Sequence, residues 1–152
     1  MENSSKTIVT TSNNGISRVK LNDPKTYNAL SLETIKLLIN HFDAFDKDEK
    51  TKVVIIEGSG KGFSAGHNLK EISSLKGKPE YKELFTLCSK LMMSIINNSK
   101  PVIAKVHGAS FAAGCQLVAS CDLAISTSDA IFATPGVNIG LFCSTPMVAV
   151  SR

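Results

Sequence analysis

Residues 101–117 read Pro101-Val102-Ile103-Ala104-Lys105-Val106-His107-Gly108-Ala109-Ser110-Phe111-Ala112-Ala113-Gly114-Cys115-Gln116-Leu117. The first part, up to Val106, is apolar and rich in β-branched residues, which is typical of a strand buried on both faces. A loop of Gly, Ala and Ser follows, and residues 111–120 then predict a short helix of small residues. Such a loop frees backbone N–H groups to face a ligand, and its small side chains allow close approach.

An earlier stretch has the same organisation. A buried-strand pattern at residues 53–56 ends in a Gly-rich loop, and residues 61–70 read Lys61-Gly62-Phe63-Ser64-Ala65-Gly66-His67-Asn68-Leu69-Lys70. Two backbone donors directed at one oxygen make an oxyanion hole. We therefore expect the two loops to be the halves of one site. Neither loop contains a glutamate that could act as a general acid or base.

The remaining pattern predicts one α/β domain over residues 1–152. Strands are expected at residues 7–11, 16–21, 53–56, 102–106, 122–126 and 131–133. The Asn-Gly pair at Asn14 and Gly15 is typical of a hairpin turn between the first two strands. Amphipathic helices are expected at 31–46, where Ser31 is a candidate cap, and at 80–97. Residues 142–150 predict the start of a further helix.

Composition narrows the classes of function. Hydrophobic residues make up 43% of the chain and charged residues 20%, as in a soluble globular protein. The net charge of +4 comes from scattered lysines, with no dense basic run and no Trp, so we expect no nucleic-acid partner. The longest apolar runs are too short and too interrupted to span a bilayer, so we expect no membrane partner. The N-terminus has no targeting signal, so we expect a bacterial cytoplasm or an organelle matrix. The four cysteines, Cys88, Cys115, Cys121 and Cys143, predict free thiols and no metal site.

Several motifs in register resemble one family. Residues 65–70 resemble the A-G-A-D-L-K loop of the crotonase superfamily, which contains the enoyl-CoA hydratases and isomerases. Residues 106–117 resemble its V-x-G-x-x-x-G-G-G-x-E-L segment, and Asn28-Ala29-Leu30 matches its N-A-L. Further matches at residues 121–124 and 132–135 extend the resemblance over about residues 8–150. The resemblance implies a crotonase-like spiral of ββα units that is truncated, with the C-terminal helical segment of the family missing.

The resemblance also implies a substrate. The site would bind acyl-CoA or enoyl-CoA thioesters, with coenzyme A as part of the substrate and no tightly bound cofactor. The backbone N–H groups of His67 and Ala113 would form the oxyanion hole. Substrate-binding positions would be Lys25, Tyr27, Ala29, Ala65, Asn68, Leu69, Lys70, Gly114 and Pro135. A role in fatty-acid metabolism, and a homotrimer or dimer of trimers, would follow for a full-length member of the family.

The chain departs from the family where proton transfer is needed. The two glutamates of the hydratases correspond to Gln116 and Gly136. A glutamine can orient a water molecule but cannot exchange a proton near neutral pH, and a glycine has no side chain. The imidazole of His67 is a candidate acid or base because its pKa lies near neutral. Three functions stay open: an enzyme that stabilises a thioester enolate, a non-catalytic acyl-CoA-binding or regulatory protein, and a non-functional truncated fragment.

Overall fold

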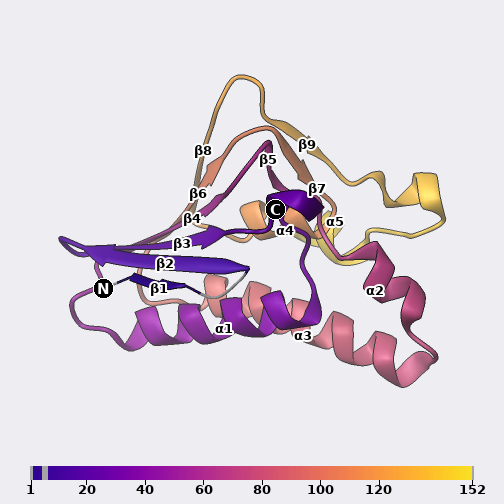
Figure 1. The fold of residues 1–152 in the computed structure, drawn as a ribbon, viewed down its shortest axis with the longest axis horizontal. Coiled ribbons are helices and arrows are strands. Elements are labelled where there is room, and N and C mark those ends of the chain that lie inside the picture. Colours follow the sequence, from indigo (N-terminus) through magenta and orange to yellow (C-terminus); the bar gives the residue numbers. More distant parts are fainter. Residues whose placement is uncertain (1, 5–6, 152) are drawn as a thin grey trace.

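The computed structural model describes residues 2–4 and 7–151, with side chains for 7–151 (Figure 1). The larger sheet has the order β1-β2-β3-β4-β6-β8. Its strands are β1 (Glu2–Ser4), β2 (Ile8–Asn13), β3 (Ile16–Leu21), β4 (Val53–Gly58), β6 (Val102–Val106) and β8 (Leu123–Ser126). The pairs β1–β2 and β2–β3 are antiparallel, and the strands from β3 onward are parallel. A smaller parallel sheet contains β5 (Gly62–Ser64), β7 (Ala109–Phe111) and β9 (Ile131–Ala133).

The chain alternates between the two sheets in three successive units. The strand pairs β4–β5, β6–β7 and β8–β9 each place their first strand in the larger sheet and their second strand in the smaller one. Helices follow each pair: α2 (Leu69–Ser74) and α3 (Lys78–Ile96), then α4 (Ala113–Ala119), then α5 (Ser144–Val150). This arrangement is the spiral of ββα units that the resemblance implies.

Local signals predict several elements correctly. Asn14 and Gly15 both have positive φ, 51° and 78°, as a two-residue hairpin turn requires. The Ser31 hydroxyl accepts the Thr34 N–H at 3.1 Å and caps α1 (Leu32–Lys47). The helix expected at residues 111–120 is wrong in its first part, because Phe111 ends strand β7 and α4 begins at Ala113. The partners of β7 are β5 and β9, which lie far away in sequence, so no local pattern reveals it.

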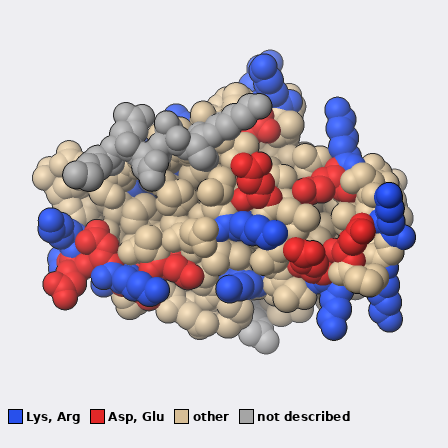
Figure 2. All heavy atoms as spheres, turned by 60° about the horizontal axis from the view of Figure 1, so that its bottom comes forward, with Lys and Arg blue, Asp and Glu red and all other residues tan. Residues whose placement is uncertain are grey.

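The main core lies between the larger sheet and the helices α1 and α3, which run side by side beneath it in Figure 1. Ile35, Leu38 and Phe42 of α1 are fully buried, as are Leu84 and Leu91 of α3. On the side of the molecule seen in Figure 2, Lys and Arg side chains are interspersed with Asp and Glu. No helix within residues 2–4 and 7–151 is long and apolar enough to cross a bilayer.

The end of the described chain presents a different surface. All four residues of β8 are exposed, and the exposed fractions of Leu123 and Ile125 are 61% and 65%. Large exposed side chains continue through β9, the short 3-10 helix η2 (Pro135–Ile139) and the segment that follows it, where Phe142 is 72% exposed. This part of the molecule therefore presents apolar side chains to the solvent, and their burial against another protein surface would be favourable.

Asn28 connects the segment before α1 with the segment between β4 and β5. Its side chain is 2% exposed, and its Nδ2 donates to the carbonyl oxygens of Ser59, Gly62 and Phe63 at 2.8, 2.9 and 3.1 Å. Its Oδ1 accepts the Asp23 N–H at 3.0 Å. Asn28 also has φ +54°, a backbone conformation that asparagine tolerates better than most residues. This one side chain therefore fixes the segment that bridges β4 and β5.

We predict that Asn28→Ala lowers the free energy of unfolding by about 3 kcal/mol, because several buried backbone groups lose their partner. Denaturant unfolding followed by circular dichroism measures the change. The matched control is Asn40→Ala, which changes an exposed residue of α1 and is expected to shift stability by less than about 0.5 kcal/mol. Equal effects of the two substitutions would contradict the role given to Asn28.

Candidate functional site

The two Gly-containing loops are in direct contact. Gly66 has φ +87°, and a Cβ atom on it would lie 2.8 Å from the Phe111 oxygen and 3.0 Å from the Ala113 nitrogen. A Cβ atom on Gly114 would lie 2.5 Å from the Ser64 oxygen. No side chain fits at either position without movement of the backbone. Glycine at both positions allows the first turn of α4 to lie against β5 and the loop that follows it.

Two backbone donors at this contact have no hydrogen-bond partner among residues 7–151. Leu30 and His67 form an isolated parallel β-bridge, in which the Leu30 N–H donates to the Gly66 oxygen at 2.8 Å and the Asn68 N–H donates to the Leu30 oxygen at 3.3 Å. The N–H of His67 takes no part in these two hydrogen bonds. Ala113 is the first residue of α4, where a helix has no internal partner for the N–H group. Within residues 7–151, neither N–H makes a hydrogen bond. Both residues line the same cavity.

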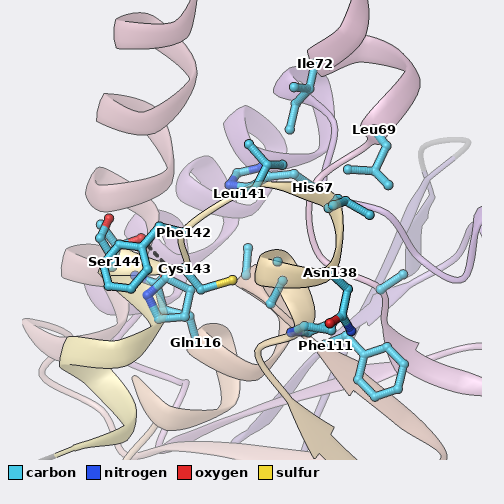
Figure 3. A pocket seen from close by; sticks show the side chains of 18 of the residues that line it. His67, Leu69, Ile72, Phe111, Gln116, Asn138, Leu141, Phe142, Cys143 and Ser144 are labelled. Atoms are coloured by element: carbon cyan, nitrogen blue, oxygen red, sulfur yellow. Dashed lines mark hydrogen bonds between the residues drawn. The ribbon is translucent and has the colours of Figure 1, made fainter.

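The cavity has a volume of about 740 Å³ and lies between the first turn of α4, α2 and the segment that leads into α5 (Figure 3). Most of its wall is apolar, formed by Leu69, Ile72, Phe85, Phe111, Leu141 and Phe142 together with smaller residues. No Asp, Glu, Lys or Arg of the described chain lines it. The described residues also contain no cluster of His, Cys, Asp and Glu suited to a metal ion. The wall therefore suits an apolar group with a few hydrogen-bond acceptors.

Gln116 lies in the wall of the cavity with a fixed amide. It is 5% exposed, and its Oε1 accepts a hydrogen bond from the Thr145 hydroxyl at 3.1 Å. Its Nε2 has no partner among residues 7–151 and belongs to a side chain that lines the cavity (Figure 3). Thr145 therefore holds one end of the amide and leaves the other end as a donor for a bound molecule.

Gly136 has no room for a side chain. It is buried, and a Cβ atom on it would lie 2.4 Å from the Leu141 oxygen and 2.6 Å from Cys143 Sγ. The Leu141 N–H also donates to the Gly136 oxygen at 2.8 Å. This hydrogen bond holds residues 136–141 in a closed turn. A carboxylate at residue 136 would therefore require this segment to move.

The His67 imidazole faces apolar surroundings. Its ring packs edge-on against Phe85, with 5.8 Å between the ring centroids. Burial lowers the pKa of His67, and the backbone of Leu30 opposes this shift, so the imidazole is neutral at pH 7. Its Nδ1 is buried without a partner among residues 7–151. The side chain can therefore accept a proton only at pH values below the ordinary range of a histidine.

The positions expected to bind substrate divide into two groups. Ala65, Leu69 and Pro135 line the cavity beside His67, Ala113, Gln116 and Gly136. Six other expected positions do not line it: Lys25, Tyr27, Ala29, Asn68, Lys70 and Gly114. Asn68 caps α2, where its Oδ1 accepts the N–H groups of Lys70 and Glu71 at 3.1 and 3.3 Å. Lys25 and Tyr27 are exposed on and just after the 3-10 helix η1 (Pro24–Thr26).

Sequence reasoning missed two polar residues of the cavity, Asn138 and Thr145. Their segment crosses the cavity because of contacts with α4, such as the Thr145–Gln116 hydrogen bond, and no motif signals such a contact. Asp122 has a structural role outside the cavity, because its Oδ2 accepts the Val102 N–H at 2.7 Å and joins β6 to the start of β8.

Comparison with known proteins identifies the family. The family model described as enoyl-CoA hydratase/isomerase matches residues 11–150. Human enoyl-CoA hydratase domain-containing protein 3, mitochondrial, is 51% identical over 140 residues, which cover 91% of this chain and 46% of that protein. The crystal structure of that human protein matches with a TM-score of 0.92 and 46% identity over 96% of this chain and 58% of the solved chain.

A bacterial structure gives the same result. The crystal structure of an enoyl-CoA hydratase from Mycobacterium smegmatis matches with a TM-score of 0.94 and 44% identity, over 97% of this chain and 58% of that one. The chain spans about half the length of the curated relatives it matches. The family match, the sequence identity and the shared fold lead to one conclusion: the chain belongs to the enoyl-CoA hydratase/isomerase family and has the crotonase fold.

Proposed function

We propose that the cavity binds an acyl-CoA thioester, with the carbonyl oxygen between the backbone N–H groups of His67 and Ala113. The observation that carries this proposal is the pair of unpartnered donors on two touching loops, at the wall of one apolar cavity. Such an oxyanion hole stabilises the enolate of the thioester, and one donor of this kind contributes about 3 kcal/mol in other enzymes. The apolar wall suits the acyl chain and favours a role in fatty-acid metabolism.

The chemistry proposed for this cavity is enolate stabilisation without a pair of carboxylates. No carboxylate of the described chain lines the cavity, Gln116 offers an amide, and residue 136 has no room for a side chain. Hydration needs one group to take a proton from water and another to give one to the α-carbon. Residues 7–151 supply neither as a carboxylate, so we expect slow hydration of enoyl thioesters.

A non-catalytic acyl-CoA-binding protein is the second candidate. The same absence of carboxylates from the described part of the wall favours it. Turnover of crotonyl-CoA separates the two candidates, because a binding protein retains the thioester without consuming it. The human relative is named as mitochondrial, which favours an organelle matrix over a bacterial cytoplasm for this chain. The exposed apolar side chains of β8 and β9 support association into the trimer that the resemblance implies.

We predict that Gly66→Ala weakens the binding of butyryl-CoA at least about tenfold, or about 1.4 kcal/mol. The new methyl group would meet the Phe111 oxygen and the Ala113 nitrogen and separate the two donors. Isothermal titration calorimetry measures the affinity. The matched control is Gly140→Ala, which also has a positive φ, +73°, but nothing within 4 Å of its Cβ position. Equal affinities of the unsubstituted chain and Gly66→Ala for butyryl-CoA would contradict the proposed site.

We predict that Gln116→Glu raises the rate of crotonyl-CoA hydration about 100-fold over the unsubstituted chain, as expected for an added general base. The carboxylate can still accept the Thr145 hydrogen bond. Burial raises the pKa of such a carboxyl, so the gain should decline as the pH falls through that pKa. Loss of the enoyl thioester absorbance measures the rate. The control is Gln116→Leu, and a Glu variant no faster than the Leu variant would show that no water binds beside residue 116.

A further inference from the structure

A thiol occupies the part of the cavity where residue 136 has no side chain. Cys143 lines the cavity, and its Sγ lies 2.6 Å from the position that a Cβ atom of residue 136 would take. In Figure 3 the sulfur of Cys143 projects toward the interior of the cavity from the segment that leads into α5. The reactive side chain beside residue 136 is therefore a thiol and not a carboxylate.

A second observation at the same place indicates a ligand. Gln116 is 5% exposed, lines the cavity and has an Nε2 group without a partner within residues 7–151. This Nε2 group is accessible from the cavity, so it can donate a hydrogen bond to a polar atom of a bound molecule. The thiol and the donor thus share a cavity in which a polar group of a ligand is expected.

The other three cysteines lie outside the cavity, and burial raises the pKa of each of them. Burial raises the pKa of Cys88 to about 11, and burial followed by the charge of Asp122 raises that of Cys121 to about 12. Burial, and after it the neighbouring Cys143, raise the pKa of Cys115. Because the thiolate is the nucleophile, these three thiols are poorly reactive near neutral pH.

We propose that Cys143 adds to the β-carbon of an α,β-unsaturated acyl-CoA bound in the cavity and forms a covalent thioether with it. This inference rests on the proposed function, because the thioester must first bind with its carbonyl oxygen at the two backbone donors. The sulfur lone pair forms the S–C bond, and the C=C electron pair moves to the carbonyl oxygen as an enolate. The α-carbon then takes one proton from water, which balances the proton that the thiol releases.

This addition needs no carboxylate. Hydration requires a base to activate water, whereas a thiol supplies its own nucleophile once it loses a proton. The two backbone donors stabilise the enolate in both reactions. The free Nε2 of Gln116 is available to the ligand in the same cavity. The product is a saturated acyl-CoA that stays attached to the protein, and no oxidant or reductant is consumed.

The test is intact-protein mass spectrometry of the full chain after incubation with crotonyl-CoA. Mass spectrometry does not require a monodisperse sample. We expect a mass increase of one crotonyl-CoA per chain, and peptide mapping should place it on Cys143. Butyryl-CoA, which lacks the double bond, should give no adduct. Cys143→Ser should lose the adduct, whereas Cys121→Ser, which changes a thiol outside the cavity, should keep it.

The outcomes separate this inference from the proposed function. Butyryl-CoA binding without a crotonyl-CoA adduct at Cys143 would overturn the inference and leave the proposed function standing. An adduct that maps to another cysteine, or that persists in Cys143→Ser, would overturn it as well. If butyryl-CoA does not bind in calorimetry, the proposed function fails, and the inference fails with it.

Discussion

The close approach of Gly66 to the first turn of α4 is the constraint that gives the site its form. It requires glycine at residues 66 and 114, since a Cβ atom at either would overlap backbone atoms. It also requires β5 and β7 to pair in parallel in the smaller sheet, so that the loops after them meet. The alternation of strands between two sheets provides this pairing, and α1 and α3 cover the larger sheet and stabilise it.

The close contact between Gly66 and α4 also leaves two backbone N–H groups available to a ligand, in a cavity with few side chains that could transfer a proton. The N–H groups of His67 and Ala113 are available because the local backbone leaves them outside its own hydrogen bonds. The groups around them are an amide held by Thr145, a thiol and a neutral imidazole. A cavity of this kind favours reactions in which the substrate or a thiol supplies the reactive electrons, and it disfavours activation of water by a carboxylate.

Local signals predicted much of the fold. The Asn14-Gly15 turn, the Ser31 cap and the helical periodicity of α1 and α3 depend on neighbours in sequence, and each is confirmed. Features set by distant contacts could not be predicted. These are strand β7, the hydrogen bonds of the Asn28 side chain, the bond between Thr145 and Gln116, and the crowding at Gly136. Motif spacing indicated the two loops, but only the folded chain shows how little room surrounds residue 136.

The most direct test of the account is the ionisation of acetoacetyl-CoA, whose α-proton is acidic enough to pass to water without a protein base. Its enolate absorbs in the near ultraviolet, so a pH titration with saturating protein reports enolate stabilisation alone. The account predicts that binding shifts the titration to lower pH by about two units, the effect of about 3 kcal/mol of selective stabilisation. A titration identical to that of free acetoacetyl-CoA, although the ester is bound, would contradict the proposed oxyanion hole.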